Sequence, residues 1–106
     1  MKRVRLDTSE IRDWESFHDV FHRTMGFPDY YGANMDAWID CMGYVNHPES
    51  GMSQVFVEPG EMLVLEISWA EDFRKRCPDQ FDALVDCAAI VNAERCSEPV
   101  LAFVFL

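Results

Sequence analysis

Two aspartates one helical turn apart, with two tyrosines shortly before them, are the residues of this chain best suited to chemistry or binding. Asp36 and Asp40 are spaced i, i+4, with the small Ala37 between them, and Tyr30 and Tyr31 precede them. On a helix this spacing presents both carboxylates on one face. Carboxylates accept paired hydrogen bonds from arginine, and aromatic side chains are favoured at the centres of protein interfaces. The segment therefore indicates a binding patch for a cationic partner.

The same residues also have structural or catalytic interpretations. An aspartate near a helix start is stabilised by the helix dipole whether or not it binds anything. Either tyrosine can pack in the core, and Trp38 lies on the apolar side of the expected helix. Asp36 and Asp40 could act as an acid/base pair, but paired carboxylates of that kind normally face a deep cleft from separate elements. A domain this small has little room for such a cleft, so we predict a protein that is not an enzyme.

The cysteines and histidines do not form a metal-binding signature. The four cysteines, at positions 41, 77, 87 and 96, include no Cys-x-x-Cys pair. His18 and His22 could share a helix face, but glutamate does not follow His18 as the His-Glu-x-x-His pattern requires. We expect free thiols and neither a metal nor a cofactor.

The charge of the chain is strongly negative and unevenly distributed. Its 106 residues include 19 acidic and 9 basic side chains, for a formal net charge of −10. Between Thr24 and Phe73 there are nine acids and no lysine or arginine, so each acid must find water, backbone, a distant base or an external cation. Nucleic acids and anionic membranes are bound through lysine and arginine. We therefore expect a basic protein partner, and neither nucleic acid nor membrane.

The two ends of the chain favour a cytoplasmic location. The first residues are charged, and no apolar run of the kind found in signal peptides follows them. The longest apolar run, Val100–Leu106, is far shorter than the ~20 residues that cross a bilayer.

Hydrophobic periodicity predicts helices and strands in alternation. Strands are expected over residues 2–6, 62–67 and 100–106. Helices are expected from Asp13 to Gly26, from the capping residue Asn34 to Met42, over residues 69–76, and from Pro78 onward. This order predicts a single α/β domain over residues 1–106, with a three-stranded parallel sheet covered by about four helices.

The segment before the middle strand leaves one alternative open. Glu58–Glu61 has the proline and glycine of a type II turn. Gln54–Val57 could therefore form a fourth, edge strand that pairs as a hairpin with residues 62–67.

Residues 28–41, with the sequence PDYYGANMDAWIDC, resemble the hallmark segment of the barstar family of intracellular ribonuclease inhibitors. The Tyr-Tyr-Gly-x-Asn-x-Asp-Ala part is specific, whereas the rest of the chain is similar in pattern only. The resemblance implies a barstar-like fold in which the second helix and the loop before it plug a ribonuclease active site. Asp40 would be the principal anchor, in the place of substrate phosphate. By position, the implied contacts are Tyr30, Asn34, Asp36, Ala37, Asp40, Gly43 and Tyr44.

The sequence also departs from the family pattern. Tyr44 stands where the family has tryptophan, and Glu49–Glu61 is an insertion. The acidic contact expected on the last long helix falls near Ile90, between Asp86 and Glu94. We predict a monomeric inhibitor of a basic ribonuclease that protects the host cell. The alternative is a barstar-like domain that binds a different basic toxin or a regulatory partner.

Overall fold

Helices and strands alternate along the chain in the predicted order. The structure is a computed structural model that describes residues 2–106. Its main elements are β1 (Lys2–Leu6), α1 (Trp14–Met25), α2 (Met35–Met42), β2 (Leu63–Ile67), α3 (Ala70–Arg76), α4 (Pro78–Ile90) and β3 (Leu101–Phe105). The prediction of an α/β fold with a three-stranded parallel sheet and four helices is confirmed.

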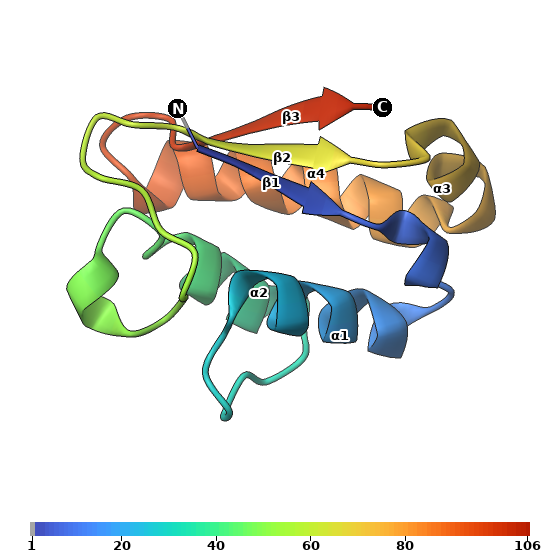
Figure 1. Cartoon of the computed structure of the whole chain (residues 1–106), viewed down its shortest axis with the longest axis horizontal. Coiled ribbons are helices and arrows are strands. Elements are labelled where there is room, and N and C mark those ends of the chain that lie inside the picture. Colours follow the sequence, from blue (N-terminus) through green and yellow to red (C-terminus); the bar gives the residue numbers. More distant parts are fainter. Residues whose placement is uncertain (1) are drawn as a thin grey trace.

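The sheet has the order β1-β2-β3, and both pairs of strands are parallel. At its centre Leu65 lies between Val4 of β1 and Phe103 of β3. Leu65 is fully buried because β2 has a strand on either side and helices against one face. On the other face, Glu66 forms an ion pair with Arg3 of β1 at 3.2 Å. In the view of Figure 1, α4 runs along the strands and α1 and α2 lie below it.

The segment at residues 54–57 is not a strand, so the fourth, edge strand that the sequence left open does not form. The backbone N–H of Val55 donates to the carbonyl of Met25 at 3.1 Å, and that of Val57 donates to Val45 at 2.9 Å. Carbonyls in the last turn of a helix have no partner within that helix. The segment pairs with groups at the end of α1 and in the turn that follows α2, and it does not extend the sheet.

The turn that follows has the predicted geometry. Glu61 donates its backbone N–H to the carbonyl of Glu58 at 3.0 Å, and Gly60 has a φ of +88°. This positive φ is the one that a type II turn requires at its third residue, and glycine adopts it without strain.

Side chains at both ends of α1 define where this helix begins and stops. The Asp13 carboxylate accepts the backbone N–H of Ser16 at 2.8 Å, while the Ser16 side chain accepts the N–H of Asp13 in return. Gly26 ends the helix with a φ of +68°. Between these ends, Phe17 and Phe21 point into the core, where both are buried.

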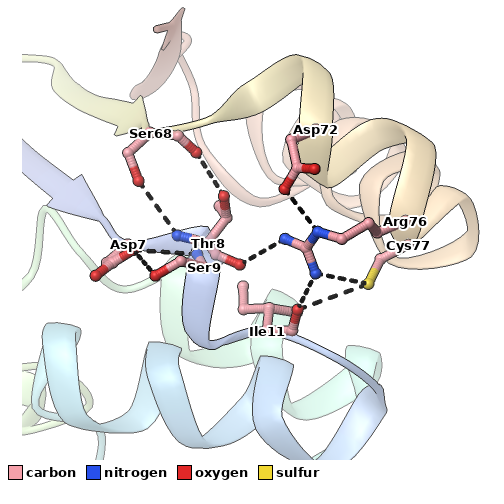
Figure 2. Close-up of polar contacts among 8 residues, drawn as sticks. All are labelled: Asp7, Thr8, Ser9, Ile11, Ser68, Asp72, Arg76 and Cys77. Carbon is pink, nitrogen blue, oxygen red and sulfur yellow. Dashed lines mark hydrogen bonds and ion pairs between the residues drawn. The ribbon is translucent and has the colours of Figure 1, made fainter.

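A set of polar contacts around Arg76 fixes the chain between β1 and α1 (Figure 2). The guanidinium donates to the backbone carbonyls of Ile11 at 2.7 Å and Thr8 at 3.0 Å, and pairs with Asp72 at 2.6 Å. Thr8 donates its hydroxyl to the carbonyl of Ser68, just beyond β2. The basic end of α3 therefore holds the start of α1 against the sheet.

The last helix begins at Pro78, as predicted, and its final turn is unusual. A π-helical turn, Val91–Arg95, continues α4 towards β3. Asn92 in this turn accepts the backbone N–H groups of Val100 and Leu101, both at 2.9 Å, which fixes the turn against the start of β3. None of the helices within residues 2–106 is both long enough and apolar enough to cross a membrane.

Candidate functional site

The helix that carries the two aspartates begins at a side-chain cap. Asn34 has extended backbone angles, and its side-chain oxygen accepts the backbone N–H of Ala37 at 2.8 Å. Asp36 lies in the first turn, where a negative charge is favoured by the helix dipole. The predicted start of this helix at Asn34 is therefore confirmed.

Replacing Asn34 tests its capping role in the free protein, where no partner contributes. We expect Asn34→Ala to lower the free energy of unfolding by ~1 kcal/mol, because the N–H of Ala37 loses its acceptor. Asn34→Asp retains an acceptor and should stay close to the wild type. Urea denaturation of the three proteins measures this difference, and equal stability of the alanine and aspartate variants would show that the cap is unimportant.

The inner face of α2 is held in the core by aromatic packing. Trp38 is fully buried and meets Phe21 of α1 edge to face, with ring centroids 5.6 Å apart. Ile39 and Met42 are also buried, whereas Met35 at the first turn is half-buried. This packing determines which side of the helix faces solvent.

The outer face of α2 presents the aspartates beside a small hollow. Asp36 is exposed, and Ala37 and Asp40 are half-buried. The hollow has a volume of about 150 Å³. Its lining consists of Tyr30, Tyr31, Gly32, Ala37, Asp40, Cys41 and Met52. The structure thus brings together the predicted contacts Tyr30, Ala37 and Asp40, and the loop before α2 projects away from the sheet (Figure 1).

The two adjacent tyrosines have different surroundings. Tyr30 is 76% exposed, and its hydroxyl donates to the sulfur of Met52 at 3.5 Å. Tyr31 is half-buried, and its hydroxyl lies 2.6 Å from Nδ1 of His18. Burial raises the pKa of Tyr31 well above its ordinary value. Tyr31 therefore holds the loop against α1, and Tyr30 is the more exposed of the two tyrosines.

The burial of His18 makes stability depend on pH. Burial lowers the pKa of His18, and the charge of Asp19 opposes this to a smaller extent. The unfolded chain, in which histidine titrates near ~6.5, then binds more protons than the folded one. The stabilisation is present above that pH and is lost as the pH falls through it. We expect the free energy of unfolding to decrease between about pH 7 and pH 5.

The matching control is His18→Gln, which retains a side chain able to bond Tyr31 but cannot titrate. Urea denaturation at several pH values should give a flatter profile for this variant. Asp7 and Asp13, whose pKa values are lowered by hydrogen bonds from Ser9 and Ser16, titrate below this range. Identical profiles for the variant and the wild type would contradict the assignment to His18.

Asp40 already has a cationic neighbour in the free protein. Nη2 of Arg95 lies 2.8 Å from Oδ1 of Asp40, and the two side chains are 43% and 51% exposed. The partner of Asp40 comes from the π-helical turn after α4, and sequence reasoning did not identify it. One feature of the sequence could have pointed to it: Arg95 is the only lysine or arginine after Arg76.

The two remaining predicted contacts lie just beyond α2. Gly43 is buried at the end of the helix, where an added Cβ would lie 3.0 Å from the carbonyl oxygen of Ile39 and 3.1 Å from Cβ of Arg95. Tyr44 is 45% exposed, and its ring meets that of His47 edge to face. Close packing therefore explains why position 43 has no side chain. Of the two residues, Tyr44 is the more accessible to a partner.

The acidic face extends from α2 towards α4. Cys87 of α4 has its pKa raised by burial, with smaller effects from the charges of Asp86 and Asp36. Both carboxylates therefore lie near this thiol, and both are exposed. Of the two acids that flank Ile90 in the sequence, Asp86 is the one whose charge, with that of Asp36, acts on Cys87.

Comparison with known proteins identifies relatives of the whole chain. The family model described as "Barstar (barnase inhibitor)" matches residues 1–106. A protein of Bacillus subtilis (strain 168) named "Putative ribonuclease inhibitor YrdF" is 39% identical over 93 residues, which cover 81% of this chain and 100% of that protein.

Proposed function

The chain belongs to the barstar family, and we propose that it inhibits a basic ribonuclease by covering the active site with the outer face of α2 and the loop before it. The observation that carries the proposal is the position of Asp40. Asp40 lines a hollow that Tyr30 and Ala37 also line, on a helix whose opposite face is fixed in the core. The inhibitor therefore presents its anchor in a preformed position, which reduces the ordering cost of binding.

The chemistry of this face suits a site built to hold phosphate. Ribonucleases bind the phosphates of RNA with cationic side chains, and a carboxylate offers those side chains acceptors of the same charge sign. Asp36, in the first turn of α2, adds an exposed negative charge to the same helix. The net charge of −10 attracts a basic enzyme over long range and raises the association rate at low salt. Barnase and barstar are themselves the standard example of such steering.

A second candidate partner is favoured by the inserted segment. Met52 from this segment lines the hollow and bonds Tyr30, so the face has a component that comes from outside the hallmark motif. In this alternative the same face binds a different basic toxin or a regulatory protein. The protein would still act by binding and not by catalysis.

Co-purification separates the two candidates. The tagged chain, expressed in the cytoplasm of its source cell, should retain a basic secreted-type ribonuclease whose association slows as salt is raised. We further expect the complex to have one copy of each protein and to lack activity on RNA. Recovery of a partner without ribonuclease activity would instead support the alternative.

A further inference from the structure

Asp40, the proposed anchor of the binding face, already has an ion-pair partner at one of its carboxylate oxygens in the free protein. Oδ1 of Asp40 pairs with Nη2 of Arg95 at 2.8 Å. The guanidinium of Arg95 is thus the chemical group that a ribonuclease would bring to the same carboxylate. Two guanidinium groups on one aspartate would stand within a few ångströms of each other and repel.

Packing, as well as charge, places Arg95 at this position. The start of its side chain lies against Gly43, where an added Cβ would come within 3.1 Å of Cβ of Arg95. The thiol of Cys96, the next residue, contacts the carbonyl oxygen of Gly43 at 3.8 Å. The π-helical turn is therefore seated on the end of α2, one helical turn from Asp40.

We propose that Arg95 is an internal competitor that masks Asp40 in the free protein and is displaced by a cationic group of the partner. This inference rests on the proposed function and names a residue that tunes the affinity and selectivity of that site. The pair is half-exposed, so exchanging one guanidinium for another in water costs little. A partner that supplies a well-placed arginine can displace Arg95, whereas a weakly placed cation cannot.

The test uses barnase as the probe and the variant Arg95→Gln, which retains the stem that packs on Gly43 but removes the charge. We expect this variant to bind barnase roughly fivefold more tightly than the wild type, as expected when one exposed ion pair no longer has to be broken. The matched control is Arg74→Gln on α3. Arg74 also forms an exposed pair, with Glu71 at 2.7 Å, and its removal changes the net charge equally.

A double-mutant cycle distinguishes competition from a general charge effect. In the Asp40→Ala background, Arg95→Gln should improve affinity only as much as Arg74→Gln does. The inference is overturned if Arg95→Gln weakens binding, because Arg95 would then help the partner directly. It is also overturned if Arg95→Gln and Arg74→Gln bind barnase with equal affinity when Asp40 is present. If Asp40→Ala by itself did not weaken binding to barnase, that result would count against the proposed function instead.

A second arm needs no ribonuclease. Agmatine, a small guanidinium compound, is titrated into each protein while the backbone amide signals of Tyr30, Ala37 and Cys41 are followed by NMR. These residues line the hollow beside Asp40. Half-maximal shifts should occur at a severalfold lower agmatine concentration in Arg95→Gln than in the wild type or Arg74→Gln. Equal concentrations in all three would overturn the competitor role even if barnase is not the natural partner.

Discussion

Asp40→Ala is expected to weaken binding to the ribonuclease by at least ~2 kcal/mol, which is roughly 30-fold in Kd. The carboxylate lies at the hollow on the outer face of α2, where it would be enclosed by the partner and accept charge-assisted hydrogen bonds. Removing it leaves cationic groups of the enzyme unpaired at the centre of the interface, and this position is where single residues dominate binding energy. Isothermal titration calorimetry or surface plasmon resonance with barnase measures the change.

The control for this prediction is Asp82→Ala, another exposed aspartate within a helix. The charge of Asp82 acts on Arg74 of α3, and Asp82 is not among the residues that line the hollow. The two variants lose the same charge, so long-range steering should weaken similarly in both. If Asp82→Ala cost as much affinity as Asp40→Ala, net charge alone would explain binding and the assigned face would be wrong.

Trp38→Ala is expected to lower the free energy of unfolding by ~3–5 kcal/mol, because it empties the largest fully buried position in the protein. Trp38 joins α2 to Phe21 of α1, so its loss should loosen the helix that carries Asp40. Urea denaturation monitored by far-UV circular dichroism measures the effect. Because domains of this kind are stable by only ~5–15 kcal/mol, the variant should unfold at much lower denaturant concentration.

Two other variants keep this prediction testable if Trp38→Ala does not fold. Trp38→Phe should cost much less, because within residues 2–106 the indole N–H of Trp38 has no hydrogen-bond acceptor to lose. Trp69→Ala removes the same side chain from a position that is 66% exposed and should change stability little. A large loss in Trp69→Ala, or a negligible one in Trp38→Ala, would contradict the described core.

The sequence predicted those parts of the fold that local patterns determine. Apolar residues at helical spacing, with Asp13 and Asn34 as caps and Gly26 as a stop, marked α1 and α2 because caps and periodicity act over a few residues. The sequence left open whether residues 54–57 form an edge strand, for the opposite reason. The backbone partners of this segment are distant in the sequence: Met25 ends α1, and Val45 lies in the turn after α2. No local pattern indicates such a pairing.

The same distinction holds for the site. The i, i+4 spacing of Asp36 and Asp40 placed both away from the apolar face of the helix, which the structure bears out. Tyr30 and Tyr31 lie in a loop without periodicity, so only tertiary contacts reveal that Tyr31 bonds His18. Arg95 reaches Asp40 from a separate element, and charge counting gave a distant base only as one of several possible partners.

The measurement that tests the central claim most directly is a titration of RNA cleavage by barnase with the purified chain. The account predicts that activity falls in proportion to added inhibitor and reaches zero near one equivalent, and that Asp40→Ala requires a much larger excess. Full ribonuclease activity in the presence of excess wild-type chain would contradict the proposal that this acidic face blocks a ribonuclease active site.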